Sequence, residues 1–293
     1  MNRIEQLGPP VARHGEGPLW DDERQQLLLV DIPTGDVLTW DPESAKQPAR
    51  QHVAPAVGAV RLRAGGGLVA GTRTGFALVD HGGTVRELDP LWPDTDLRMN
   101  DGTCDSAGRF WCGSMSEDDE RGPGHGALWC LDPITLAARV ALAGVTVSNG
   151  IAFANGNGFA AGSSRAFYVD SPTRRVDVLQ IEADRVVDRE PWASVEIGEG
   201  VPDGICLDAE GGLWVAIHDG AAVVRYDSQG RLDAVLEMPV GRPTACTFGG
   251  ADLDVLYVTT SAVDSPDDER GSAGALFAVR PGVRGLAAYR FAG

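Results

Sequence analysis

An imperfect internal repeat constrains the fold of this 293-residue chain more than any other feature. In each copy, a short apolar strand ends near an aspartate or an equivalent residue, a glycine-rich turn follows, and two further strands come next. The three clearest copies begin at Gly17-Pro-Leu-Trp20, Asp101-Gly-Thr-Cys104 and Asp203-Gly-Ile-Cys206, and weaker copies begin near Val57, Ser148 and Pro243. Six units spaced by roughly 40–55 residues fill the chain, which is the range for propeller blades.

The residues between the repeated strands are typical of hairpin turns. Asp105-Ser-Ala-Gly108 and Asp208-Ala-Glu-Gly211 each place a glycine where a positive φ angle is needed. No long stretch has apolar residues at helical spacing. A β-sandwich would not explain a repeat over nearly the whole chain, and a parallel β-helix would need a much shorter period. The sequence therefore predicts an all-β, six-bladed β-propeller, with residues 1–293 in a single domain because no linker divides them.

The formal charge of −17 makes nucleic acid a poor partner, because a negative surface repels phosphate backbones. An odd cysteine count without any C-x-x-C pair favours reduced cysteines, with a Cys104–Cys112 disulfide as the alternative. Met1–Gly8 lacks the features of a signal peptide, and no apolar run is long enough to span a bilayer. We therefore expect a soluble, cytoplasmic protein with no membrane partner. Its oligomeric state leaves no trace in the sequence.

Common catalytic motifs are absent from the sequence. The five histidines do not occur in H-x-H or H-x-x-x-H spacing. No G-x-S-x-G elbow is present, which argues against an α/β-hydrolase, and no G-x-G-x-x-G follows a strand. The site therefore has to be sought among polar residues that recur in phase with the repeat.

Polar residues stand at matching places in four repeats, each directly before a glycine or an Asp-Gly step. They are Glu16, Asn100 with Asp101, Asn149 and Asp203. In a propeller they would lie where each blade enters the central channel. Two carboxylates and an amide oxygen would form a hard, all-oxygen site that suits Ca²⁺, Mg²⁺ or Mn²⁺, whereas Zn²⁺ or Fe²⁺ is less natural without histidine or cysteine. The alternative is that Asp-Gly and Asn-Gly are simply turn formers.

Five segments in order resemble the SMP-30/gluconolactonase/luciferin-regenerating-enzyme family, which includes regucalcin-like proteins. The resemblance covers nearly the whole chain. It is carried by Glu16-Gly-Pro-Leu-Trp20, by residues 98–115 from Arg98-Met-Asn-Asp-Gly102 to Gly113-Ser-Met115, by Ser148-Asn-Gly-Ile-Ala152, by Pro202-Asp-Gly204, and by residues 243–250 with Leu256-Tyr-Val-Thr-Thr260.

The resemblance implies a propeller with one divalent metal, Ca²⁺ before Zn²⁺, Mn²⁺, Mg²⁺ or Fe²⁺, held by Glu16, Asn149 and Asp203. It also implies that Arg98 and Asn100 contact substrate, that an acidic residue does so too, and that Asp203 is the general base. We assign the acidic role to Asp118, with Glu117 as the alternative. Asp101 is either a support for Asn100 or a turn residue, and His14 is a structural or rim residue.

Members of that family open sugar lactones, so the resemblance implies a metal-dependent, gluconolactonase-like hydrolase with a small-molecule lactone as its partner. Metal and Asp203 would polarise the carbonyl and activate water. One alternative is a non-enzymatic propeller that binds calcium or a ligand. Another is a phosphotriesterase-like hydrolase that uses the same metal. A WD- or kelch-type interaction propeller is disfavoured, because no Gly-His…Trp-Asp signature recurs.

Overall fold

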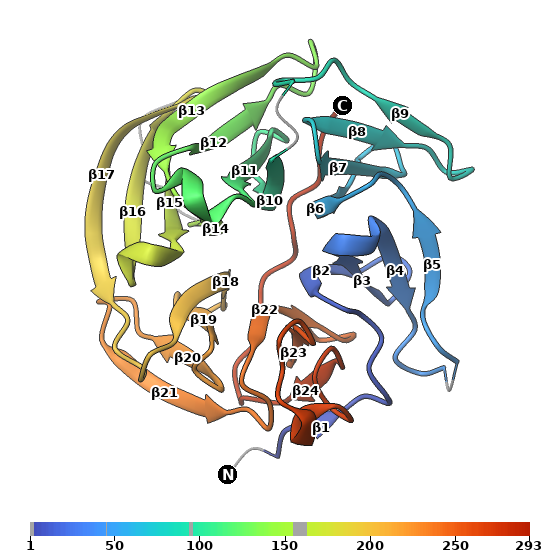
Figure 1. The fold of residues 1–293 in the computed structure, drawn as a ribbon, viewed down its shortest axis with the longest axis vertical. Coiled ribbons are helices and arrows are strands. Elements are labelled where there is room, and N and C mark those ends of the chain that lie inside the picture. Colours follow the sequence, from blue (N-terminus) through green and yellow to red (C-terminus); the bar gives the residue numbers. More distant parts are fainter. Residues whose placement is uncertain (1–2, 45, 94–95, 155–162) are drawn as a thin grey trace. The chain divides into compact units, whose positions relative to one another are not determined.

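The computed structural model describes residues 3–293 except 45, 94–95 and 155–162, and these residues form six four-stranded antiparallel sheets. The sheets are the blades of a six-bladed β-propeller, so the predicted fold class is confirmed (Figure 1). The chain divides into two compact units: Met1–His52 with Val195–Ala288, and Val53–Ser194 with Tyr289–Gly293. The assignment of all residues to one domain stays a prediction.

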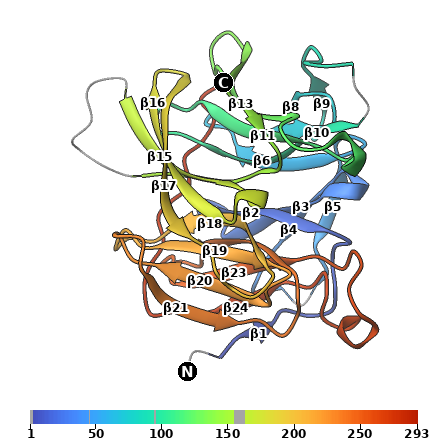
Figure 2. The ribbon, with the colours of Figure 1, turned by 60° about the vertical axis from the view of Figure 1, so that its left-hand side comes forward.

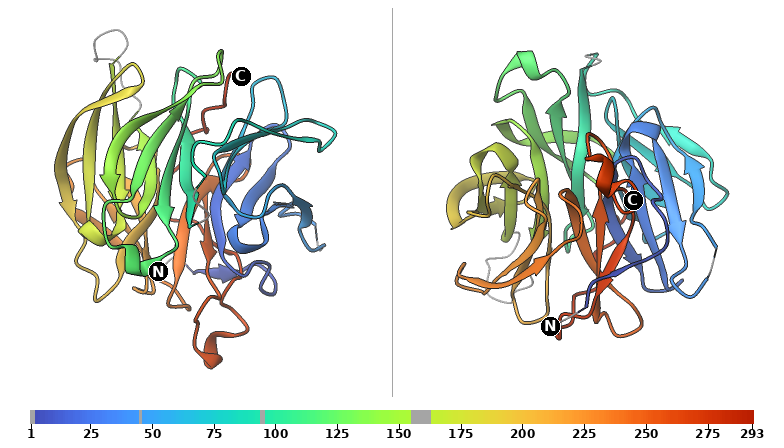
Figure 3. Two further views of the ribbon diagram at one scale, coloured as in Figure 1. Left: turned by 45° about the horizontal axis from the view of Figure 1, so that its top comes forward. Right: turned by 60° about the horizontal axis from the view of Figure 1, so that its bottom comes forward.

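The first unit contains three of the sheets, in the strand orders β2-β3-β4-β5, β18-β19-β20-β21 and β22-β23-β24-β1. Its strands are β1 (Glu5–Gln6), β2 (Gly15–Asp21), β3 (Gln26–Asp31), β4 (Asp36–Trp40), β5 (Ala49–His52), β18 (Val201–Leu207), β19 (Leu213–His218), β20 (Ala222–Tyr226), β21 (Leu232–Glu237), β22 (Pro243–Gly249), β23 (Val255–Thr260) and β24 (Phe277–Val279). The outermost strand of the last sheet comes from the N-terminal segment, because Glu5 pairs with Ala278. Short 3-10 turns occur at η1 (Ile32–Thr34) and at η4 (Asp267–Glu269), which lies in a loop that extends beyond β23 and β24 (Figures 2 and 3).

The second unit contains the other three sheets, in the strand orders β6-β7-β8-β9, β10-β11-β12-β13 and β14-β15-β16-β17. Its strands are β6 (Val57–Leu62), β7 (Leu68–Thr72), β8 (Phe76–Val79), β9 (Val85–Glu87), β10 (Leu97–Cys104), β11 (Phe110–Ser116), β12 (Gly126–Leu131), β13 (Ala138–Val145), β14 (Ser148–Phe153), β15 (Ser163–Asp170), β16 (Arg175–Glu182) and β17 (Arg185–Ser194). The 3-10 turns are η2 (Asp119–Arg121) and η3 (Ser171–Thr173).

Burial falls from the first strand of each sheet to the last. Every residue of β2 is buried and β3 is nearly so, whereas β5 and β21 are largely exposed. The first strands pack against one another within each unit, β22 between β2 and β18, and β10 between β6 and β14. Because β3 and β19 are covered on both faces, they are almost continuously apolar.

A buried aspartate closes the first hairpin of two sheets. The Asp208 carboxylate accepts hydrogen bonds from the amides of Glu210 and Gly212, from the Trp214 indole at 2.9 Å and from Arg225 Nε at 2.7 Å. Asp105 repeats the arrangement with the indole of Trp111, six residues further on. The turn glycines, Gly108 and Gly211, have φ angles of 74° and 81°, so the predicted hairpins with positive-φ glycines are confirmed.

All five cysteines are free thiols, which contradicts the alternative of a Cys104–Cys112 disulfide. The sulfur atoms of Cys206 and Cys246 are 3.6 Å apart. Within the described ranges, the structure has no helix with the length and apolar character needed to cross a bilayer.

Candidate functional site

The candidate polar residues lie at a β-bulge that recurs in the first strand of every sheet. In each sheet the register between the first and second strands shifts near the start of the first strand. The shifts fall between Glu16 and Leu19, Val57 and Ala59, Met99 and Gly102, Ser148 and Ile151, Pro202 and Ile205, and Pro243 and Ala245. A bulge adds an unpaired residue and redirects the side chains beside it. The alternative that these Asn-Gly and Asp-Gly steps are simply turn formers is contradicted, because they lie inside β10, β14 and β18.

Glycine is required in these bulges where neighbouring first strands approach closely. A Cβ atom on Gly204 would lie 2.3 Å from the Cβ atom of Ala245 in β22. A Cβ atom on Gly58 would lie 2.4 Å from the backbone oxygen of Asn100 in β10. For Gly204, which follows the candidate residue Asp203, the glycine therefore reflects packing between adjacent first strands.

The first unit contributes two buried carboxylates, Glu16 in β2 and Asp203 in β18, which are 4% and 5% exposed. Glu16 Oε2 accepts a hydrogen bond of 2.8 Å from the amide of Gly17. Strand β22 lies between their two strands, and its Thr244 hydroxyl donates to the backbone oxygen of Gly15 at 2.6 Å. Burial of a carboxylate is costly unless a cation or hydrogen-bond donors compensate its charge. Two such groups at equivalent bulges are therefore suited to a cation.

The second unit contributes a continuous hydrogen-bonded chain of polar side chains. Arg98 Nη1 donates to Asn100 Oδ1 at 2.6 Å, and Asn100 Nδ2 donates to Asn149 Oδ1 at 2.6 Å and to the backbone oxygen of Ser148 at 3.0 Å. Asn149 Nδ2 in turn donates to Ser171 Oγ at 2.8 Å. All four side chains belong to buried residues. The chain fixes the orientation of both amides, so that Asn149 Oδ1 faces the Asn100 amide.

Glu117, and not Asp118, contacts the predicted substrate-binding residue Arg98. Glu117 Oε1 accepts from Arg98 Nε at 2.9 Å, and its Oε2 accepts from Arg73 Nη1 at 2.8 Å. Burial raises the pKa of Glu117, but the two arginines outweigh burial and hold that pKa below its usual value. The Asp118 carboxylate accepts from the amide of Glu120 and so caps η2, which starts at the next residue.

Asp101 forms a buried ion pair with Arg61 of β6, with 3.9 Å between Asp101 Oδ1 and Arg61 Nη2. The same oxygen accepts from the amide of Gly102 at 2.6 Å. Burial raises the pKa of Asp101, although the charge of Arg61 opposes the rise. Of the two roles expected for this residue, the turn role is contradicted because Asp101 lies inside β10, and its role as a support for Asn100 stays a prediction.

Ser171 is a site residue that the sequence reasoning missed. It lies in Val169-Asp170-Ser171-Pro172-Thr173, which parallels Val30-Asp31-Ile32-Pro33-Thr34 in the first sheet. Asp31 accepts from the amides of Arg13 and His14, and Asp170 accepts from those of Thr146 and Val147. In both cases one aspartate binds two successive backbone amides, and Glu16 and Asn149 each lie two residues after the second of these amides. The two residues therefore occupy equivalent positions. The shared Val-Asp-x-Pro-Thr pattern could have revealed Ser171.

His14 lies at the entry to β2 and meets a second histidine. Its Nδ1 atom is 2.8 Å from Ser261 Oγ, and its ring centroid is 6.4 Å from that of His218 at the end of β19. Burial lowers the pKa of His218, and Arg242 lowers it further while Asp219 opposes the change. The expectation of a structural or rim role for His14 agrees with this position beside the first strand.

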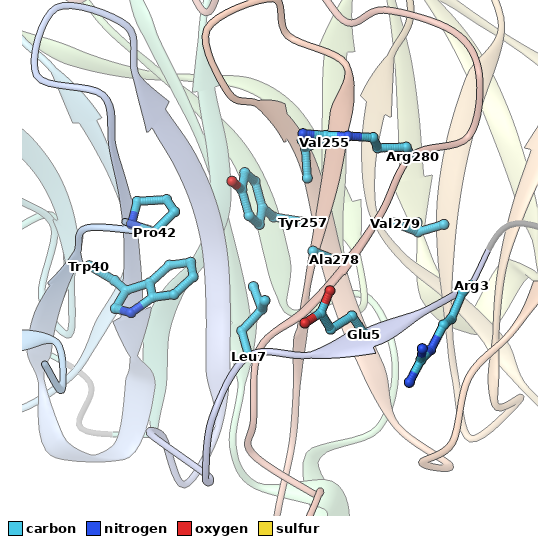
Figure 4. A pocket seen from close by; sticks show the side chains of 10 residues that line it. All are labelled: Arg3, Glu5, Leu7, Trp40, Pro42, Val255, Tyr257, Ala278, Val279 and Arg280. Carbon is cyan, nitrogen blue, oxygen red and sulfur yellow. The ribbon is translucent and has the colours of Figure 1, made fainter. Parts of the chain in front are cut away.

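A separate pocket of about 630 Å³ lies in the first unit, beside β1, β23 and β24 (Figure 4). Trp40 and Tyr257 line it, with 6.3 Å between their ring centroids in an edge-to-face arrangement, together with Glu5. None of the predicted site residues lines this pocket. Among the described residues, no three His, Cys, Asp or Glu side chains gather into a metal-binding group, and the predicted metal ligands are of another kind, two carboxylates with an amide.

Comparisons with known proteins agree with this architecture. Residues 14–262 match the model of the SMP-30/gluconolactonase/LRE-like region. Regucalcin from Gallus gallus is 34% identical over 309 residues, covering 99% of each chain. A luciferin-regenerating enzyme structure superimposes with a TM-score of 0.87 and 29% identity over 100% of both chains. The structure of a gluconolactonase from Xanthomonas campestris, 22% identical, has a TM-score of 0.73 over 95% of this chain and 89% of that one, a likeness of fold alone. The resemblance found in the sequence is thereby confirmed.

Proposed function

Because the chain belongs to the SMP-30/gluconolactonase/LRE-like family, we propose that it is a metal-dependent hydrolase that opens sugar lactones to aldonic acids. One observation carries the proposal: the polar residues expected at the site lie at the recurrent bulges of buried first strands. A polar group is costly to bury, so its repeated burial at equivalent places favours a ligand-binding role.

The donor set supports a divalent metal ion as cofactor. Glu16 and Asp203 supply carboxylate oxygens, and the amide oxygen of Asn149 was expected as the third ligand. Asn149 Oδ1 already accepts one hydrogen bond from Asn100, and a carbonyl oxygen has a second lone pair for a metal. Oxygen donors without histidine or cysteine favour Ca²⁺ first, then Mg²⁺ or Mn²⁺, over Zn²⁺ and Fe²⁺. Such an ion supplies Lewis acidity to the lactone carbonyl when bound.

The proposed reaction needs a base for the attacking water and an acid for the ring oxygen. We assign both roles to Asp203, which accepts the water proton and then returns it to the leaving alkoxide. Metal ligation competes with this duty for the same carboxylate. Lactone hydrolysis develops negative charge on the carbonyl oxygen, and stabilising that charge lowers the barrier.

Arg98 and Asn100 differ in their capacity to contact substrate. Both N–H groups of the Asn100 amide are used by Ser148 and Asn149, and its Oδ1 accepts from Arg98. Asn100 therefore has one oxygen lone pair left for a sugar hydroxyl, and its main role is to hold Arg98 and Asn149 in place. Arg98, with several guanidinium donors, is the proposed contact to the substrate oxygens.

The test is a proton-release assay over a panel of aldonolactones, before and after EDTA and after Ca²⁺ is restored. We expect turnover that EDTA abolishes and Ca²⁺ restores, and a loss of at least about 100-fold in Asp203→Asn and Glu16→Gln. Asp227→Asn, at an exposed turn of the same unit, is the matched control. Substantial activity in either site variant would remove this mechanism.

Two other outcomes separate the alternative functions. Stoichiometric Ca²⁺ binding without turnover of any lactone would favour a non-enzymatic binding protein. Faster hydrolysis of a phosphotriester than of every lactone would favour a phosphotriesterase-like enzyme on the same residues.

A further inference from the structure

We infer that Arg73, a residue outside the expected site, is a positioning residue that orients Arg98 through Glu117 and thereby sets the affinity for substrate. This inference rests on the proposed function only for its kinetic test. It concerns three charged side chains of the second unit, in which Glu117 contacts Arg73 and Arg98 directly.

Arg73 is held firmly at its backbone. It follows β7 directly, and its carbonyl oxygen accepts a hydrogen bond of 3.1 Å from the Trp92 indole. Two backbone hydrogen bonds hold the turn that begins at Arg73, since Thr72 N donates to Gly75 O and Leu91 N donates to Thr74 O. A fixed backbone restricts where the guanidinium can reach, so the ion pair with Glu117 costs less conformational entropy than a pair between two mobile side chains.

Glu117 joins two arginines with separate oxygen atoms. Its Oε2 accepts from Arg73 and its Oε1 from Arg98, at 2.8 and 2.9 Å. The amide of Glu117 donates to Asp96 O at 2.7 Å, which fixes the start of the side chain. A carboxylate held at one oxygen by Arg73 has little freedom to rotate away from Arg98.

Arg98 is fixed at two places as a result. Its Nε donates to Glu117, while its Nη1 donates to Asn100 Oδ1 and to the Met99 carbonyl oxygen. The Arg98 side chain is 10% exposed, whereas that of Glu117 is 39% exposed. Without Arg73, the Glu117 carboxylate can move into solvent, and Arg98 then loses its hydrogen-bond partner at Nε. Loss of that contact allows the guanidinium plane of Arg98 to tilt about its Nη1 contacts.

Loss of the Arg73 side chain should therefore weaken substrate binding and have little effect on the chemical step. We expect Arg73→Met to raise KM by about 3- to 10-fold for the aldonolactone that the wild-type protein opens fastest, with kcat changed less than 2-fold. Arg73→Lys keeps the charge but loses the planar donor group, so its KM should lie between the KM of the wild type and that of Arg73→Met. Arg86→Met, a surface arginine of β9 in the same sheet, is the control and should match the wild type.

A double-mutant cycle distinguishes the relay from a local structural effect. If Arg73 acts through Glu117, Arg73→Met should have no further effect on KM in a Glu117→Gln background. Additive effects of the two substitutions, or an Arg73→Met protein that behaves like Arg86→Met, would overturn the inference. Equal melting temperatures of the variants exclude loss of folding as the cause.

A spectroscopic readout keeps the inference testable if the wild type opens no lactone in the panel, an outcome that would reject the proposed function alone. The Arg98 Nε–H group should give a slowly exchanging ¹H–¹⁵N signal, assigned by its loss in Arg98→Lys. Arg73→Met should shift that signal and speed its exchange at least several-fold. An unchanged signal would refute the relay whatever the activity.

Discussion

Removal of the Asp208 carboxylate should destabilise the first unit strongly, because this side chain holds one hairpin and its tryptophan together. The Asp208 side chain is fully buried and accepts four hydrogen bonds, from two backbone amides, the Trp214 indole and Arg225. In Asp208→Ala these donors lose their acceptor, and Arg225 loses its buried partner. Arg225 retains Asp233 and Glu210, which limits the cost.

The expected loss in the free energy of unfolding follows from the contacts that Asp208 makes. A hydrogen bond to a charged group contributes roughly 1.5–3 kcal/mol, and breaking a buried ion pair costs about 3–5 kcal/mol. Because water can reach Arg225 after relaxation, we expect a loss of about 3–5 kcal/mol in the free energy of unfolding and not the full sum. That corresponds to a fall in Tm on the order of 10 °C.

Urea denaturation followed by tryptophan fluorescence measures this loss directly. Asp227→Ala is the matched control, since Asp227 makes the same kind of turn contacts with Gln229 and Arg231 at the surface. Its effect should be much smaller, because solvent replaces the lost acceptor. If Asp208→Ala and Asp227→Ala shift the midpoint equally, burial of the carboxylate does not explain the stability of this hairpin. Asp208→Ala should also reduce the proposed lactonase activity, because Asp208 directly follows β18, the strand that carries Asp203.

Three further predictions address the site. Gly204→Ala should cost about 1–3 kcal/mol in urea denaturation, since its Cβ would lie 2.3 Å from that of Ala245, whereas Gly271→Ala, with open space around it, should be nearly neutral. Asn100→Ala should lower kcat/KM more than Ser171→Ala in the lactone assay, because Asn100 links Arg98 to Asn149. Two arginines lower the pKa of Glu117, although burial opposes them. The contribution of Glu117 to stability is therefore complete above the ordinary glutamate pKa of about 4.3, and it is lost as the pH falls through the lower pKa of the folded protein. A ¹³C titration that shows a raised pKa for Glu117 would contradict this pH dependence.

The sequence predicted the fold because the propeller is a repeated local pattern. Strands, hairpin glycines and the Asp-turn-Trp steps at Asp105 and Asp208 are each set by residues within a few positions of one another. Such short-range preferences can still be recognised in the sequence when the copies of the repeat differ from one another. Recurrence of a polar residue before glycine also pointed to Glu16, Asn149 and Asp203, although their assignment as metal ligands stays a prediction.

The reason for those glycines was decided by tertiary structure. Asn-Gly and Asp-Gly favour turns locally, yet Asn149-Gly150 and Asp203-Gly204 lie at bulges inside strands. At Gly204, the packing of β18 against β22 leaves no room for a Cβ atom. Contact between Arg73, Glu117 and Arg98 joins side chains of different sheets, so no local pattern distinguishes Glu117 from Asp118. Residue spacing along the chain fixes which strands form and which positions recur. Only the packing of one strand against another determines which of those side chains meet.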